Sequence, residues 1–127
     1  MRRLALVVLG GGFGSGARYL VGGWVAQAVG SAFPYGTIAI NALGSFLISA
    51  VMYLGLTAGA ISPDLRLLLA TGVMGGFTTY STFNYESLAF FQQGAWLLGA
   101  LNILATVFLC LAAGALGLIL SRWAFGP

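Results

Sequence analysis

Long apolar stretches alternate with short turns along the whole chain. A helix that crosses the roughly 30 Å hydrocarbon layer of a membrane needs about 20 predominantly apolar residues. Four stretches meet this length, with approximate bounds at residues 4–29, 35–56, 65–91 and 95–120. The pattern predicts an all-α membrane protein in which four transmembrane helices form a single domain over residues 1–127.

The third stretch contains features that interrupt a helix. Gly75 and Gly76 lie at its centre, and each glycine lowers helix stability by about 1 kcal/mol relative to alanine. The threonine and serine residues that follow offer the backbone competing hydrogen-bond partners. Because unpaired carbonyls at membrane depth are costly, a break in mid-membrane predicts a cation or a water-filled cavity beside residues 75–78. The alternative is a plain kink in which threonine hydroxyls bond back to backbone carbonyls.

Polar residues form a stripe along the second stretch and a shorter one along the fourth. Residues four apart share a helical face, and two rows follow that spacing: Thr37, Asn41, Ser45, Ser49 and Tyr53, then Asn102, Thr106 and Cys110. Polar groups are costly in hydrocarbon, so both rows should face the protein interior. Amides and hydroxyls donate hydrogen bonds and no acidic ring accompanies them, which favours a path for an anion. Interhelical hydrogen bonding is the alternative role.

An aromatic pair follows the two glycines. Tyr80 and Phe83 are three residues apart and therefore share a helical face. An aromatic ring has a negative face and a positive edge, so a dehydrated anion is stabilised against ring edges. The alternative is that both rings only fill space between helices.

The composition excludes most soluble and enzymatic functions. Hydrophobic residues make up 60% of the chain, charged residues only 6%, and the mean hydropathy is +1.01. Soluble domains contain about 25% charged residues. With no histidine, one cysteine and two acidic residues, the chain has little for hydrolytic or metal chemistry, and we expect it not to be an enzyme. A net charge of +3 is too small to indicate nucleic-acid binding.

The arginines predict the orientation of the chain. With four crossings, both termini share one side of the membrane with Arg2, Arg3, Arg66 and Arg122, and the positive-inside rule makes that side cytoplasmic. Arg2 and Arg3 before an apolar run also imitate a signal peptide. The run continues beyond signal-peptide length, so we expect it to be retained.

A family signature surrounds the expected break. It consists of GGFTTYSTF at residues 75–83, preceded by Gly36, Thr37 and Asn41 ahead of Gly44. With these residues the chain resembles the CrcB/Fluc family of fluoride channels, over nearly its whole length. The resemblance implies an antiparallel, dual-topology homodimer in a bacterial inner (plasma) membrane, with two fluoride pores and a structural sodium ion on the twofold axis. A heterodimer with an oppositely oriented partner protein is the alternative.

The resemblance also implies roles for individual residues. The backbone carbonyls of Gly75 and Thr78 would bind sodium. Asn41 would donate a hydrogen bond to fluoride, and the edges of Tyr80 and Phe83 would line its path. Further pore positions are Thr37, Ser45, Thr82, Asn102, Thr106 and Cys110, and the pore-adjacent positions are Arg18, Thr79 and Glu86.

Three positions depart from the family pattern. Tyr80 stands where many members have phenylalanine, and it brings a hydroxyl that is able to donate to the ion. Asn102 stands where an aromatic hydroxyl is expected, and Cys110 where serine is expected. A thiol is a weak donor, so the fourth stretch is where this chain differs most from the family.

The function implied is passive export of cytoplasmic fluoride. The membrane potential supplies about 2.3 kcal/mol per charge per 100 mV, so no coupling machinery is required. Two other functions fit parts of the sequence. A small proton-coupled multidrug exporter would use Glu86, the only acid within a predicted span, as its titrating carboxylate. A structural membrane subunit would account for the glycines but not for the polar stripe or the break.

Overall fold

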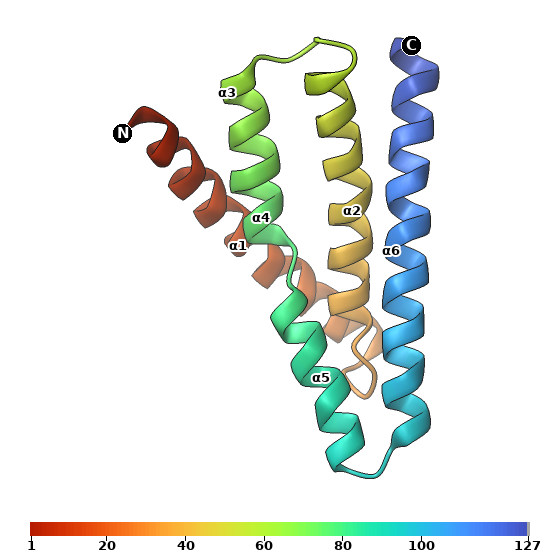
Figure 1. The fold of residues 1–127 in the computed structure, drawn as a ribbon. Coiled ribbons are helices and arrows are strands. Elements are labelled where there is room, and N and C mark those ends of the chain that lie inside the picture. Colours follow the sequence, from red (N-terminus) through yellow and green to blue (C-terminus); the bar gives the residue numbers. More distant parts are fainter. Residues whose placement is uncertain (127) are drawn as a thin grey trace.

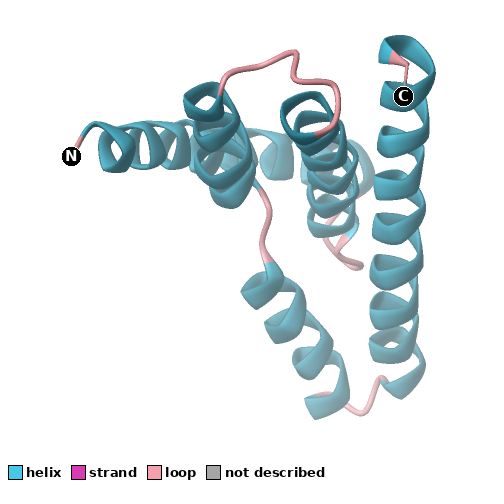
Figure 2. Ribbon diagram, turned by 45° about the horizontal axis from the view of Figure 1, so that its top comes forward, coloured by secondary structure: helices cyan, strands magenta, loops and turns pink. Residues whose placement is uncertain are grey.

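The computed structural model describes residues 1–126, and every regular element within that range is a helix (Figures 1 and 2). Three helices are continuous: α1 (Arg2–Val29), α2 (Tyr35–Leu56) and α6 (Trp96–Phe125). All three are long and apolar enough to cross a membrane. The predicted all-helical class is confirmed, and the three apolar helices make the protein a multi-pass membrane protein.

The third predicted stretch is divided into four short segments. They are α3 (Pro63–Arg66), the π-helical segment η1 (Leu67–Met74), α4 (Gly75–Phe77) and α5 (Tyr80–Gln92). This region is not among the helices that are long enough to span a membrane by themselves. Figure 1 shows α3, η1 and α4 as one coil and α5 as a second, with a short non-helical link between them.

Turn chemistry sets several of the helix ends. Ser62 caps α3, because its Oγ accepts a hydrogen bond from the Leu65 N–H at 3.2 Å, and Pro63 occupies the first helical position. Gly30 ends α1 with a φ of 83°, and Gly94 turns the chain from α5 into α6 with a φ of 75°. Both angles lie in the left-handed region that glycine adopts without a steric penalty.

The helices form a skewed arrangement. Figure 1 shows α2 and α6 running side by side, while α1 crosses obliquely behind η1 and α4. α5 contacts the first part of α6, and both described ends of the chain lie at the same end of the molecule in Figure 1.

Glycines allow α1 to cross closely over η1 and α4. A Cβ added to Gly14 would overlap the Val73 carbonyl oxygen, and one added to Gly76 would overlap the Gly11 carbonyl oxygen. At Gly10 a Cβ would lie 2.7 Å from the Leu68 carbonyl oxygen. The two segments therefore touch backbone to backbone, as small residues allow in membrane proteins.

The buried core lies beside the interruption. Ile40 of α2, Met74 of η1 and Phe77 of α4 pack together, with partly buried side chains of α1 around them. This core sets the point along α2 at which that helix packs against η1 and α4. At the end of the molecule that carries the amino terminus, Asp64 of α3 pairs with Arg2, and with Arg3 through an Nε–Oδ1 distance of 3.5 Å.

Candidate ion pathway

The backbone leaves the helical conformation at two residues. Thr78 has φ −79° and ψ 158°, and Thr79 has φ −151° and ψ 106°, so both are extended. The side-chain amide of Asn41 pairs with the backbone of Thr79 in both directions: Nδ2 donates to the carbonyl oxygen at 3.0 Å, and Oδ1 accepts from the N–H at 2.8 Å. Asn41 and Thr79 are both buried, so these bonds form away from lipid and water.

Two N–H groups near the break donate to side chains rather than to the carbonyls four residues earlier. In a continuous α-helix the N–H of Thr79 would bond to the Gly75 carbonyl, and that of Thr82 to the Thr78 carbonyl. Here the Thr79 N–H bonds to Asn41, and the Thr82 N–H bonds to Thr79 Oγ1 at 3.3 Å. The carbonyls of Gly75 and Thr78 thus lose their helical donors. The Thr78 hydroxyl also bonds back to the Met74 carbonyl at 2.9 Å, as expected for the kink alternative.

A pocket of about 760 Å³, which we call the α2–α6 pocket, lies against the break. It contains six of the predicted pore residues together with the two extended threonines: Asn41, Ser45, Tyr80, Phe83, Thr106, Cys110, Thr78 and Thr79. The hydroxyl oxygen of Thr106 is buried and has no hydrogen-bond partner within residues 1–126. The pocket therefore combines polar donors with aromatic surface.

The aromatic pair lies at the start of α5. The rings of Tyr80 and Phe83 have centroids 5.5 Å apart and planes at 67°, an edge-to-face arrangement. Phe83 is buried, whereas Tyr80 is 78% exposed on the outer surface of the chain. Phe83 thus presents its ring within the α2–α6 pocket, and Tyr80 borders it on the exposed side.

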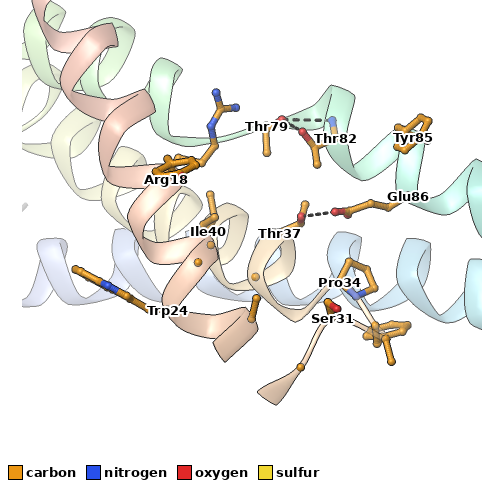
Figure 3. A pocket seen from close by; sticks show the side chains of 18 of the residues that line it. Arg18, Trp24, Ser31, Pro34, Thr37, Ile40, Thr79, Thr82, Tyr85 and Glu86 are labelled. Atoms are coloured by element: carbon orange, nitrogen blue, oxygen red, sulfur yellow. Dashed lines mark hydrogen bonds between the residues drawn. The ribbon is translucent and has the colours of Figure 1, made fainter. Parts of the chain in front are cut away.

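A second pocket of about 810 Å³, here the Arg18 pocket, is shown in Figure 3. Its lining includes Arg18 of α1, Thr37 of α2, and Thr82 and Glu86 of α5. Figure 3 shows Glu86 reaching toward Thr37, whose hydroxyl donates to Oε1 at 2.8 Å. The other carboxylate oxygen is buried without a partner in the described part of the chain. Thr79 borders both pockets.

Comparison with known proteins identifies the family. The family model described as CrcB-like protein, Camphor Resistance (CrcB), matches residues 5–118. The chain belongs to the CrcB family. This CrcB chain is 54% identical over 126 residues to a protein of Anaeromyxobacter dehalogenans named fluoride-specific ion channel FluC, covering 99% of the chain and 100% of the relative.

More distant CrcB relatives also align over nearly their whole length. Proteins with the same name from Sorangium cellulosum and Geobacter metallireducens are 47% and 42% identical, each over 122 residues. Each alignment covers 96% of the chain, with 96% and 98% of the respective relative.

The polar stripe of the CrcB chain divides between two roles. Thr37, Asn41 and Tyr53 of α2 make hydrogen bonds to other segments: to Glu86 of α5, to the linker residue Thr79, and to the Gly126 carbonyl just after α6. Ser45 and Ser49 line the α2–α6 pocket together with Asn41, and the Ser45 hydroxyl donates to the Asn41 carbonyl at 2.7 Å. The hydrogen bonds agree with the alternative of bonding between spans, and the role of the stripe in an anion path stays a prediction.

Asn102 lies apart from the other predicted pore residues. It is only 1% exposed, lines neither pocket, and donates from Nδ2 to Ser87 Oγ at 2.9 Å. Ser87 in turn donates to the Phe83 carbonyl at 2.8 Å. No role was predicted for Ser87, although its spacing of four from Phe83 on one helix is the signal that connects them.

Replacing Ser87 with alanine should lower the thermal stability of the protein. The change leaves the buried Nδ2 of Asn102 without its acceptor, which costs about 1–3 kcal/mol. The measurement is the thermal unfolding midpoint of the purified protein in detergent. Ser81→Ala is the matched control, because Ser81 lies on the same helix and is exposed. Equal midpoints for the two variants would contradict a supporting role for Ser87.

Proposed function

We propose that the protein is a fluoride channel that lets cytoplasmic fluoride leave a bacterial cell passively across the inner membrane. The observation that carries the proposal is the full-length similarity to relatives named fluoride-specific ion channels. The chemistry of the α2–α6 pocket supports it, because the described residues that line this pocket include amide, hydroxyl and aromatic groups but no ionised side chain. The function is transport, not catalysis.

Fluoride would exchange its water shell for donors along this pocket. Asn41 uses one Nδ2 hydrogen on Thr79 and has a second for the ion. Thr106 offers a buried hydroxyl without another partner, and Phe83 offers a positive ring edge. The Ser45 hydroxyl already donates to the Asn41 carbonyl, so we assign it a weaker part. Small size favours fluoride over chloride in a narrow path, since short contacts compensate best for lost hydration.

The Arg18 pocket would serve as the approach to the break. Arg18 supplies a positive charge that attracts anions, and Glu86 is held by the Thr37 hydroxyl. Thr79 borders both pockets, so its side chain is the point at which an ion would pass from one to the other. Thr82 lines the approach, while Asn102 stays a predicted pore residue only if the helices move apart.

The assembly we propose is an antiparallel homodimer with a sodium ion on its axis. In that arrangement the third region crosses the membrane as a helix broken in mid-membrane, giving four crossings. The carbonyls of Gly75 and Thr78 fit a cation, because their helical donors bond elsewhere and sodium binds oxygen ligands. Two subunits would contribute four such carbonyls. The ion supplies a positive charge that offsets their dipoles and joins the subunits. A heterodimer with an oppositely oriented partner remains the alternative assembly.

The test is fluoride efflux from liposomes that contain only this protein. Vesicles loaded with potassium fluoride should release fluoride when valinomycin is added, at a rate at least about a hundredfold above chloride release from matched vesicles. A fluoride electrode follows the first ion and a silver chloride electrode the second.

Each other outcome favours a different function. Absence of flux would favour the structural subunit. Release of fluoride and chloride from the vesicles at equal rates would exclude a fluoride-selective path. Proton uptake that depends on an added drug, and that Glu86→Gln abolishes, would favour the multidrug exporter.

A further inference from the structure

We infer that Asn41 and Thr79 are positioning residues for the cation site, because their side chains take over backbone hydrogen bonds and so leave two carbonyls available to the ion. The inference rests on the sodium site of the proposed function and adds two side chains that have no direct contact with the ion. It explains what keeps Thr78 and Thr79 out of the helical conformation.

Asn41 acts on the first carbonyl. Its amide offers one donor and one acceptor at the spacing of a peptide group, and both are bonded to the backbone of Thr79. The Thr79 N–H is thereby held away from the Gly75 carbonyl four residues earlier. Because Asn41 and Thr79 are buried, removal of the amide leaves the N–H and carbonyl of Thr79 without these partners, which favours the helical bond from the Thr79 N–H to the Gly75 carbonyl.

Thr79 acts on the second carbonyl. Its hydroxyl oxygen accepts from the Thr82 N–H at 3.3 Å and caps the start of α5. The same hydroxyl donates to Thr82 Oγ1 at 2.8 Å, which fixes its orientation. The Thr82 N–H is therefore directed away from the Thr78 carbonyl. Asn41 thus diverts the donor of the Gly75 carbonyl, and Thr79 diverts the donor of the Thr78 carbonyl. The two side chains are linked, because Asn41 bonds to the backbone of Thr79.

Packing fixes the position of α2 along its axis relative to the extended residues Thr78 and Thr79. A Cβ added to Gly44, one turn beyond Asn41, would overlap the Thr78 side chain. α2 therefore contacts the extended residues directly, and Asn41 has little freedom to slide along the break. Asn41 also lines the α2–α6 pocket, so one amide contacts both the backbone of the cation site and the anion path.

The experiment is a sodium titration of the thermal stability of the purified, full-length dimer in detergent, with N-methylglucamine holding the ionic strength constant. Asn41→Ala and Thr79→Ala should each raise the sodium concentration for half-maximal stabilisation by about tenfold or more. Thr79→Ser keeps the hydroxyl and should stay within about threefold of the wild type. Ser49→Ala is the matched control on the α2 stripe, because it lines the same pocket without a hydrogen bond to the break.

A merely structural role gives a different result. It would lower the unfolding midpoint equally with and without sodium and leave the sodium concentration for half-maximal stabilisation unchanged, which would overturn the inference. If Asn41→Ala does not fold, Asn41→Leu replaces it with the same expected result, since leucine is similar in size but neither accepts from the Thr79 N–H nor donates to its carbonyl.

Backbone amide exchange gives a second readout. At equal sodium, exchange at the Thr79 N–H should quicken in Asn41→Ala and exchange at the Thr82 N–H in Thr79→Ala; unchanged exchange in both overturns the inference. A wild-type protein without any sodium response would overturn the sodium site and this inference with it. Fluoride flux in liposomes would then still leave the channel function standing, so the two failures are distinguishable.

Discussion

Replacing Phe83 with leucine is expected to reduce fluoride efflux by at least about a hundredfold, equivalent to about 2.7 kcal/mol in the barrier. Leucine keeps most of the buried volume but has no ring edge to face the ion. Phe83 is buried, lines the α2–α6 pocket and meets Tyr80 edge to face, so its ring is already fixed where the path would run. The measurement is valinomycin-triggered efflux from liposomes, normalised to reconstituted protein.

Two further variants separate the ring edge from packing. Phe83→Ala should be as inactive as Phe83→Leu, since both remove the edge. Phe108→Ala is the control, because Phe108 lies on α6 between Thr106 and Cys110 but is 66% exposed and borders none of the pockets described above. Near wild-type efflux from Phe83→Leu would show that the ring only fills space, and the aromatic part of the path would have to be abandoned.

Adding a single methyl group at Gly14 should prevent stable folding. In Gly14→Ala the new Cβ would overlap the Val73 carbonyl oxygen and press on the Phe77 N–H, and both belong to backbone that has no rotamer to change. Overpacking of this kind costs about 3 kcal/mol or more. We expect little monodisperse protein after purification, and a thermal midpoint lower by about 10 °C in what remains.

Gly12 provides the matched comparison on the same helix. A Cβ at Gly12 meets no atom within 4 Å. Gly12→Ala should therefore be neutral or stabilising by up to about 1 kcal/mol, because alanine is the better helix former. If both variants purify and unfold alike, the close crossing of α1 over η1 is not a determinant of folding.

The sequence predicted the elements of the fold better than their arrangement. The length of the apolar stretches alone locates α1, α2 and α6, because a long stretch with almost no charge is suited to a helix that spans a membrane. Gly75 and Gly76 predicted an interruption of the third span, residues 65–91, but nothing in the side chains of Leu67–Met74 indicates the π-helical segment that precedes it. The oblique path of α1 depends on contacts between glycines more than 50 residues apart, such as Gly10 and Gly72, which no local pattern specifies.

The candidate site shows the same division between local and distant information. The spacing of four predicted that Asn41 and Ser45 share a face, and both border the α2–α6 pocket. The spacing could not say that the Asn41 amide would meet the Thr79 backbone, 38 residues away. Asn102 and Thr106 share the spacing too, yet only Thr106 reaches the pocket, since the neighbouring α5 covers Asn102 through Ser87.

The division of the third region also affects how such chains are counted. Over residues 1–126, a count of uninterrupted apolar helices alone gives three, an odd number that would assign the two ends of the protein to opposite compartments. In the fold the chain reverses three times, and its amino and carboxyl ends return to the same end of the molecule (Figure 1). With the four crossings of the proposed assembly, the divided third region restores an even count, and reporter fusions at both ends would give like signals where the count of three predicts unlike ones.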